Sequence, residues 1–413
     1  MIVKLNIWLT LPNGEILAAG ELAAADPDVR GAMTGQFRYL PEYLADPRAF
    51  ALDPVHLPLS AERFNADRPR SGVHGVFEDS LPDDWGRRLL VRRHRLAREE
   101  QRVPNLLRLF GDQGLGALRY SQVGQPPPFL PGVPCRQLAE ISSLAERFEQ
   151  APADMADEEL SLLFQAGSSP GGARPKALVA DGKTGYLAKF ASRRDHLDVV
   201  GMEAAALELA RRAGLDTVAS HLSPLASGRC LLVERFDLNA VDGRNHLISM
   251  QSLLKADGYY NAGYRDLAEV IRQVAASPQR DLRQLYRQML FNVLLGNTDD
   301  HLKNFCLLRD EQGWRLSPAF DLVPNVGFNQ EQVLRVGLDT QLPTAETLLA
   351  EAKYFGIKRR QQALEIAVLI HETVSGWRET FGACGVPEQD AKTIGLDIGQ
   401  RLQRIDFSNA GTG

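Results

Sequence analysis

The sequence contains few cysteines and no long apolar run. Its four cysteines lie far apart among 413 residues and include no C-x-x-C pair, so neither a zinc site nor a disulfide framework is indicated. No apolar stretch approaches the roughly eighteen residues of a membrane span, and the first ten residues lack the basic segment and apolar core of a signal peptide. We therefore expect a cytoplasmic protein with reduced thiols and no contact with membranes.

The sequence also lacks an excess of positive charge. A net charge of −5 at pH 7 argues against a surface that coats DNA. The exception is a helix expected after Asp83, in which seven arginines between residues 87 and 102 stand against two glutamates. A solvated helix face is the simplest interpretation of these arginines, and contact with an acidic partner or nucleic acid is the alternative.

The order of strand and helix patterns predicts three regions. Alternating apolar residues from Val3 to Leu9, followed by Pro12-Asn13-Gly14, indicate a strand and a hairpin turn. A proline-rich connector near residue 125 ends the first region, strand patterns continue to about residue 255, and helical periodicity follows. We predict an α+β fold with an N-terminal subdomain at 1–125, a β-rich lobe at 135–255 and an all-helical lobe at 256–413.

The most informative stretch is the polar loop GNTDDHLKNF at residues 296–305, which follows an apolar run. Asp299 and Asn304 have the D-x-x-x-x-N spacing of a protein-kinase catalytic loop, and Asp321 follows in LSPAFDL. Phosphoryl transfer from ATP needs a carboxylate to accept the hydroxyl proton and oxygen ligands for Mg²⁺. Asp299 fits the base, and Asn304 and Asp321 fit the metal ligands. The alternative is a simple turn with a helix cap.

Two glycine-rich stretches are candidates for phosphate binding. The backbone N–H groups of GSSPGGARPK at 167–176 could approach phosphates closely, because glycine leaves the backbone accessible. It is not a Walker A motif, since Ala173-Arg174 stand where Lys and Ser or Thr are required. A P-loop NTPase is therefore disfavoured, and a flexible surface loop is the alternative. GDQGLGAL at 111–118 matches no phosphate-binding motif.

A lysine and a glutamate follow the second glycine-rich stretch at informative positions. Lys189 lies in an expected strand, and Glu203 lies within the apolar stripe of the helix expected at 199–213. A carboxylate on a buried face is costly unless it is paired. We therefore expect the Lys189–Glu203 ion pair that orients the phosphate-binding lysine in kinases. The alternative places Glu203 at the edge of the stripe, in water.

Together these residues make the chain resemble the HipA family, the serine/threonine-kinase toxins of bacterial type II toxin–antitoxin modules. The resemblance implies a kinase-like bilobed fold and covers nearly the whole length. The segments that carry it are FEDSLPD at 77–83, SSPGGARPKA at 168–177, VERFD at 233–237, NTDDHLKNF at 297–305 and LSPAFDL at 316–322.

The resemblance implies an ATP- and Mg²⁺-dependent kinase with Asp299 as the catalytic base and Asn304 and Asp321 as metal ligands. The residues implied to bind the nucleotide are Ser168, Ser169, Gly171, Gly172, Lys176, Lys189, Glu234, Phe236, His301 and Lys303. Family members also phosphorylate a serine of the glycine-rich loop, here Ser169 or the adjacent Ser168. A phosphate there would repel ATP by its negative charge and switch the enzyme off.

The chain departs from the general kinase pattern, because no H-R-D precedes the base and neither D-F-G nor A-P-E follows. We therefore predict no activation-loop switch. The resemblance implies two partners, a helix-turn-helix antitoxin through which DNA would be contacted only indirectly, and a protein substrate such as an aminoacyl-tRNA synthetase. Two other functions stay open. They are a small-molecule phosphotransferase of the aminoglycoside-kinase type and a catalytically silent scaffold that binds an antitoxin and DNA.

Overall fold

The N-terminal region is built on a five-stranded antiparallel sheet with the order β4-β3-β2-β1-β5. The computed structural model describes residues 2–66, 68–127, 129, 132–167, 174–239, 243–256, 261–325, 327, 330–338 and 340–408. The strands of this sheet are β1 (Ile2–Thr10), β2 (Ile16–Ala25), β3 (Gly35–Tyr39), β4 (Arg63–Asn65) and β5 (Leu118–Gln122). The expected hairpin joins β1 and β2, and Gly14 has a φ of +86°, which glycine adopts without strain.

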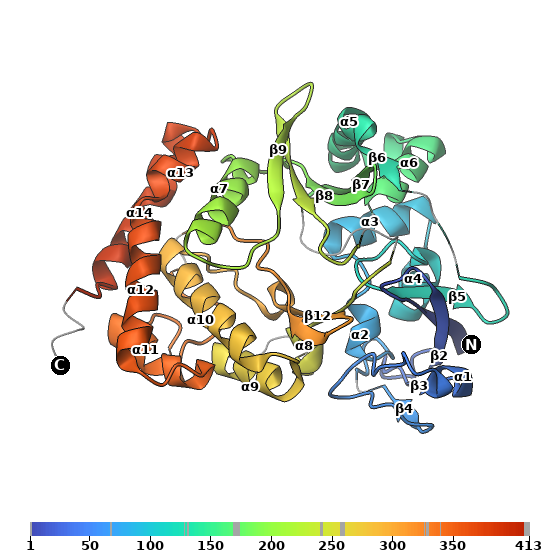
Figure 1. Ribbon diagram of the computed structural model, residues 1–413. Coiled ribbons are helices and arrows are strands. Elements are labelled where there is room, and N and C mark those ends of the chain that lie inside the picture. Colours follow the sequence, from blue (N-terminus) through green and yellow to red (C-terminus); the bar gives the residue numbers. More distant parts are fainter. Residues whose placement is uncertain are drawn as a thin grey trace.

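Short helices pack beside this sheet and connect it to the next region. They are α1 (Pro41–Ala45), α2 (Gly75–Glu78), α3 (Asp84–Arg93) and α4 (Val103–Phe110). Trp85 in the first turn of α3 is fully buried, and its ring meets that of Phe148 edge-on at 5.8 Å. The N-terminal subdomain therefore shares a core with the lobe that follows it, and α3 lies next to α6 (Asp157–Gly167) of that lobe (Figure 1).

Helix α3 carries the first four arginines of the basic stretch expected from the sequence and ends at Arg93, so the helix is shorter than the stretch. Several arginines of the stretch are bonded within the chain: Arg87 to Glu78, Arg92 to the carbonyl oxygens of residues 152 and 153, and Arg95, beyond the end of the helix, to Asp157. Part of the positive charge is therefore paired with groups of the chain itself. This favours a solvated helix face over contact with an acidic partner or nucleic acid.

The second region contains a five-stranded sheet with the order β6-β7-β8-β10-β9. Its strands are β6 (Val133–Pro134), β7 (Lys176–Asp181), β8 (Thr184–Lys189), β9 (Ser220–Pro224) and β10 (Arg229–Glu234). Helices α5 (Leu138–Gln150), α6 (Asp157–Gly167) and α7 (Val199–Arg212) pack around it (Figure 1). The β7–β8 register places Lys176 directly opposite Lys189, so two lysines lie side by side at one end of the sheet.

The third region is mainly helical and is organised around α10 (Pro278–Leu295). This helix is buried along most of its length and contacts α9 (Tyr264–Val274), α12 (Arg360–Ser375) and α14 (Glu388–Arg404). The other helices are α8 (Met250–Leu253), α11 (Ala345–Glu351) and α13 (Trp377–Ala383), and short 3₁₀ turns are η1 (Arg98–Glu100), η2 (Cys135–Gln137), η3 (Pro152–Asp154), η4 (Leu302–Asn304) and η5 (Ala352–Phe355). In the part of the chain that is described, no helix is long and apolar enough to cross a membrane.

The prediction of an all-helical third region needs correction. Strands β12 (Cys306–Asp310) and β13 (Gly313–Leu316) form a hairpin after the D-x-x-x-x-N loop, and β11 (His246–Ser249) pairs with β12. Gly313, the first residue of β13 after the turn, has a φ of +127°, a conformation that favours glycine. The hairpin connects the end of the D-x-x-x-x-N loop to the segment that leads to Asp321.

The glycine-rich stretch at 111–118 packs against the VERFD segment instead of forming a phosphate loop. The Gly116 N–H donates to Asp237 Oδ2 at 2.7 Å, and Arg235 Nη2 donates to the same oxygen at 2.6 Å. Gly116 has a φ of +77°, and a Cβ there would lie 3.2 Å from the backbone nitrogen of Leu247. Glycine is favoured at this position by its left-handed backbone conformation and by the close approach of Leu247.

A buried histidine joins the N-terminal subdomain to β11. His246 is 2% exposed, its Nε2 lies 2.8 Å from the carbonyl oxygen of Leu52, and its ring packs against those of Phe50 and Trp314. Burial lowers the pKa of His246 to about 4, because an imidazolium would lose its hydration there.

This histidine should make the protein sensitive to acid. The unfolded state binds the proton near pH 6.5 and the folded state near pH 4, so the stability is complete above pH 6.5 and falls as the pH drops toward 4. The maximal slope for one group is about 1.4 kcal/mol per pH unit. We expect His246→Gln to flatten the dependence of the unfolding free energy on pH, measured by urea titration. His221→Gln, which alters an exposed histidine, should keep the wild-type slope, and an equally steep slope in His246→Gln would contradict this assignment.

Candidate active site

The D-x-x-x-x-N loop begins where α10 ends. Gly296 terminates the helix with a φ of +80°, the left-handed conformation that glycine favours at helix ends. A Cβ at this position would lie 2.6 Å from Asp397 Oδ2 and 2.9 Å from Arg401 Nε. Gly296 is therefore needed for its backbone conformation and for the close approach of α14.

Two adjacent aspartates in this loop occupy opposite environments. The side chain of Asp299 is 80% exposed, whereas Asp300 is 1% exposed. Asp300 Oδ2 accepts hydrogen bonds from the Tyr264 hydroxyl at 2.6 Å and from Gln332 Nε2 at 3.0 Å, and Oδ1 accepts from the N–H groups of residues 333 and 334. Burial raises the pKa of Asp300 to about 6. Asp299 is accessible to a substrate, and Asp300 anchors the loop.

Helix α14 stabilises the position of Asp300 through Arg401 and Gln332. Arg401 is 1% exposed; it pairs with Asp397 at 2.7 Å and donates to Gln332 Oε1 at 3.3 Å. Gln332 in turn donates to the carbonyl oxygen of Asn297 and to Asp300. The loop therefore rests on a buried polar network that sequence analysis missed. Only the unusual position of an arginine within the apolar stripe of α14 could have indicated it.

Asn304 lies at the end of the loop, in η4. It is 9% exposed, and its Nδ2 donates to the carbonyl oxygen of Asp299 at 2.9 Å. This bond fixes the amide orientation, so Oδ1 is the atom suited to a metal ion. His301 Nε2 lies 3.9 Å from Asp299 Oδ1, beyond hydrogen-bond distance but close enough for its charge, when protonated, to act on the carboxylate.

Lys189 is the centre of the second half of the site. Its Nζ lies 2.5 Å from Glu203 Oε1 and 2.7 Å from Asp321 Oδ1, so the structure brings together three residues from β8, α7 and the segment after β13. Glu203 is 5% exposed and faces the core, which excludes the alternative of a solvated edge position. Lys189 holds the pKa of Asp321 well below its usual range, whereas burial raises that of Glu203.

Lys176 is a second buried cation beside Lys189. It is 7% exposed, and no hydrogen bond or ion pair of its ammonium group is found among the described residues. Burial, together with the charge of Lys189, lowers the pKa of Lys176 to about 8. A buried cation attracts an anion, because a negative ligand would restore the lost solvation.

Asp321 has a strained backbone conformation and follows an aromatic residue that packs against the VERFD segment. Its φ is +55°, a left-handed value that costs a non-glycine residue on the order of 1 kcal/mol. The ring of the preceding Phe320 stacks on Phe236, with centroids 5.8 Å apart.

The predicted adenine-binding backbone at Glu234 lies in β10. The N–H of Glu234 donates to the carbonyl oxygen of Ala219 at 2.8 Å, so this N–H is already used within the fold.

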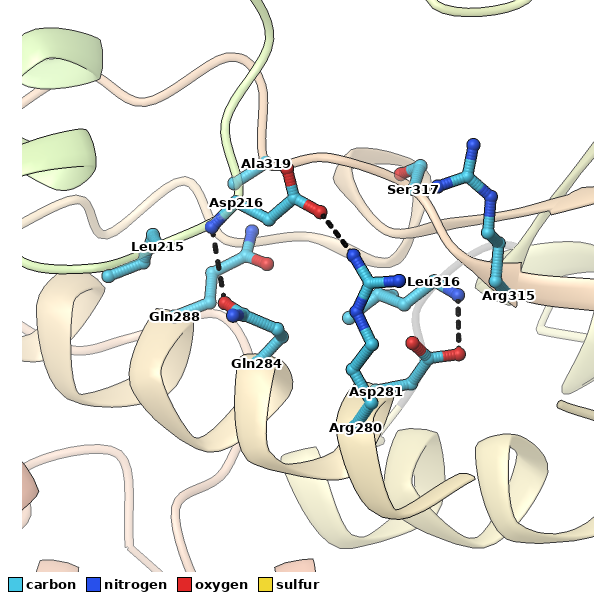
Figure 2. Close-up of a pocket in the computed structure, with 10 residues that line it drawn as sticks. All are labelled: Leu215, Asp216, Arg280, Asp281, Gln284, Gln288, Arg315, Leu316, Ser317 and Ala319. Atoms are coloured by element: carbon cyan, nitrogen blue, oxygen red, sulfur yellow. Dashed lines mark hydrogen bonds and ion pairs between the residues drawn. The ribbon is translucent and has the colours of Figure 1, made fainter. Parts of the chain in front are cut away.

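Polar side chains that line a small pocket bind the segment before Asp321 to α10 (Figure 2). Asp281 Oδ2 accepts a hydrogen bond from the Leu316 N–H at 3.0 Å, and Gln284 Oε1 accepts from the Asp216 N–H at 3.2 Å. The Ala319 N–H donates to the Asp216 carbonyl oxygen at 2.8 Å. Both halves of the site are thus positioned by α10, one through its C-terminal end and the other through these side chains.

The remaining predicted residues differ in how far they can be placed. Ser168, Ser169, Gly171 and Gly172 lie outside the described residues. Lys303 Nζ lies 2.6 Å from Asp83 Oδ1, a residue of the N-terminal subdomain. The FEDSLPD segment therefore reaches the catalytic loop, which the sequence alone did not indicate.

Two family models match the chain. The model described as HipA-like C-terminal domain matches residues 168–378, about half of the chain, and the model described as HipA N-terminal domain matches residues 17–121. The chain belongs to the HipA family. The predicted resemblance is thus confirmed.

Curated relatives of this HipA-family chain match over shorter segments. A Sinorhizobium fredii protein named Putative kinase Y4mE is 35% identical over 149 residues, which cover 33% of this chain and 35% of that protein. The Escherichia coli protein named Toxin YjjJ is 24% identical over 224 residues, which cover 49% of this chain and 48% of that protein. The chain therefore spans less than half the length of these relatives.

A solved structure matches nearly the whole chain. HipA of Shewanella oneidensis, in a toxin–antitoxin complex with HipB and operator DNA, matches with a TM-score of 0.68 and 19% identity, over 96% of each chain. This likeness concerns the fold, and it confirms the predicted α+β, kinase-like bilobed architecture.

The contrast between Asp299 and Asp300 can be tested by stability. Both carboxylate oxygens of Asp300 accept hydrogen bonds. In Asp300→Asn, an N–H₂ group would replace one of these oxygens and would face hydrogen-bond donors, with which it cannot bond. We expect a loss of about 2–4 kcal/mol in the free energy of unfolding, measured by denaturant titration. Asp299→Asn, at the exposed neighbour, should change it by no more than about 0.5 kcal/mol. Equal effects of the two substitutions would refute the division of roles.

Proposed function

We propose that this HipA-family chain is an ATP- and Mg²⁺-dependent protein serine/threonine kinase that acts as the toxin of a toxin–antitoxin module. The observation that supports this most strongly is the contact of Lys189 with both Glu203 and Asp321. A kinase needs a fixed lysine for the nucleotide phosphates and a nearby aspartate for the metal ion. In this chain Asp299 and Asn304 follow at the required spacing.

Asp321 and Asn304 fit a magnesium site by the chemistry of their donor atoms. Mg²⁺ prefers oxygen ligands and is commonly held by one or two carboxylates together with substrate phosphates. Asp321 supplies a carboxylate with a lowered pKa, and Asn304 supplies an amide oxygen whose partner nitrogen is already bonded. When bound, Mg²⁺ would neutralise charge on the phosphate oxygens.

The chain's own residues divide the remaining tasks. Asp299 is exposed and would accept the proton of the attacking hydroxyl, as a general base does. Lys189 and Lys176 would bind the phosphates, with His301 and Lys303 nearby on the loop. For the adenine, we propose the backbone at Glu234 and Phe236. Because the Glu234 N–H is already used, its carbonyl oxygen is the group that would meet the base.

The proposed partners follow from the family. The Shewanella oneidensis structure contains HipA with HipB and operator DNA, which supports a HipB-like helix-turn-helix antitoxin for this chain, with DNA contacted only through it. A cellular protein, such as an aminoacyl-tRNA synthetase, would be the substrate. Phosphorylation of Ser169 or Ser168 would repel ATP from the glycine-rich loop and end the activity.

Kinase activity can be tested by peptide mass spectrometry after incubation with Mg²⁺ and ATP. We expect phosphate on Ser169 or Ser168 in the wild-type chain and none in Asp299→Ala, because the base would be lost. Expression of the wild-type chain in bacteria without an antitoxin should arrest growth, and Asp299→Ala should not. Lys183→Ala, which alters an exposed lysine in the β7–β8 turn, serves as the control and should behave as wild type.

Each other outcome of this experiment favours another function. Phosphate transfer to a small hydroxylated molecule with no labelled protein would favour a small-molecule phosphotransferase. ATP binding without any transfer would favour a silent scaffold.

The two lysines at the end of the sheet predict how nucleotide binding depends on pH. Lys176 has a pKa of about 8 in the free protein, so its positive charge is present below pH 8 and is lost as the pH rises. ATP affinity should therefore fall up to about tenfold per pH unit above pH 8, as measured by calorimetric titration from pH 7 to 9.5. Lys176→Arg keeps its charge throughout this range and should remove the decline. Lys183→Arg is the control and should show the wild-type decline. If the affinity for ATP falls equally steeply in Lys176→Arg, Lys176 is not the cause of the decline.

A further inference from the structure

The FEDSLPD segment of the N-terminal subdomain is fixed at several points. Asp79 Oδ2 accepts from the Ser249 N–H and Oδ1 from the Ser249 hydroxyl, both at 2.8 Å, and the Ser80 hydroxyl lies 2.7 Å from the Tyr120 hydroxyl. Arg87 Nε donates to the carbonyl oxygen of Pro82 at 2.8 Å. These bonds hold the backbone in place immediately before Asp83.

Asp79 reaches the strand that pairs with the end of the catalytic loop. Ser249 is the last residue of β11 and lies opposite Cys306 in β12. The Met250 N–H donates to the carbonyl oxygen of Phe305 at 2.8 Å. Asp79 is thus anchored just beyond the loop, four residues before Asp83.

Asp83 reaches the loop itself. Its Oδ1 lies 2.6 Å from Lys303 Nζ, across 220 positions of sequence. Lys303 lies in η4, directly before Asn304, and the Asn304 N–H donates to the His301 carbonyl oxygen at 2.9 Å. The side chains of Asp83 and Lys303 are 25% and 42% exposed, so water reaches the pair and its role is in placement more than in stability.

We propose that Asp83 is a positioning residue for phosphoryl transfer, and that through Lys303 it holds η4 so that Asn304 and Asp299 keep their relative placement. The inference rests on the kinase function proposed above. It makes the N-terminal subdomain a structural part of the active site. A small displacement of η4 would affect the metal ligand and the base together, because Asn304 is bonded to the Asp299 carbonyl oxygen.

The test compares Asp83→Asn with three other variants. Lys303→Met removes the other member of the pair, Asp83→Glu retains the charge, and Asp84→Asn is the control. Asp84 is the next residue, is exposed, and has no ion pair among the described residues. We expect Asp83→Asn and Lys303→Met each to lower kcat for phosphorylation about tenfold.

The double variant separates a shared role from independent ones. If the two residues act as one pair, Asp83→Asn combined with Lys303→Met should lose no more activity than either single change. Asp83→Glu should recover part of kcat, and Asp84→Asn should match wild type. Additive losses, or wild-type kcat in Asp83→Asn, would overturn the proposal.

Hydrogen exchange gives a readout that does not depend on activity. In Asp83→Asn, amides of the peptide covering 297–305 should exchange faster than in wild type, and in Asp84→Asn they should not. If the wild-type chain transfers no phosphate, the kinase proposal fails, whereas this exchange measurement still decides whether Asp83 holds the loop. Unchanged exchange in Asp83→Asn would overturn the positioning role.

Discussion

The ammonium group of Lys189 is the point on which the rest of the site depends. It joins β8 to Glu203 on α7 and to Asp321 beyond β13, at 2.5 Å and 2.7 Å. Buried ion pairs contribute little net stability, because the desolvation of the charges offsets their attraction. A cation held by two carboxylates is therefore better explained by a need to keep its charge in one place, as the proposed phosphate-binding role requires, than by a need for stability.

The second constraint is that the two halves of the site share α10. Its C-terminal end leads into the loop with Asp299, and Asp281 near its start holds the Leu316 N–H in the segment that leads to Asp321. Asp321 can keep its left-handed backbone conformation because these contacts leave the segment little freedom. The strained Asp321 and the exposed Asp299 are thus placed relative to one rigid element.

The sequence predicted the parts of the site that depend on local spacing. Asp299 and Asn304 lie within one loop, and Glu203 stands out as a carboxylate inside an apolar helical stripe. The separate roles of Asp299 and Asp300 could not be predicted, since two adjacent aspartates differ only in what the fold packs around them. The β12–β13 hairpin was missed because its short strands carry little periodicity.

Contacts between distant segments could not be predicted from the sequence either. Arg401 supports the loop from α14, and Asp83 reaches Lys303 from the N-terminal subdomain. Each requires a tertiary arrangement that no local pattern encodes. The class of the fold was predictable, because the succession of strand and helix patterns survives in the structure, whereas the polar network behind the loop had to be observed.

Buried polar groups attach the N-terminal subdomain to the rest of the chain, in addition to the shared apolar core. Asp237 receives the Gly116 N–H, Asp79 receives Ser249, and His246 meets the carbonyl oxygen of Leu52. Removing one partner from a buried charged contact commonly costs several kcal/mol, since the remaining group is left without solvation. A movement of this subdomain would have to break such contacts together. The subdomain is therefore held rigidly against the site. A displacement of the subdomain would be transmitted through these bonds to the VERFD segment and to the D-x-x-x-x-N loop.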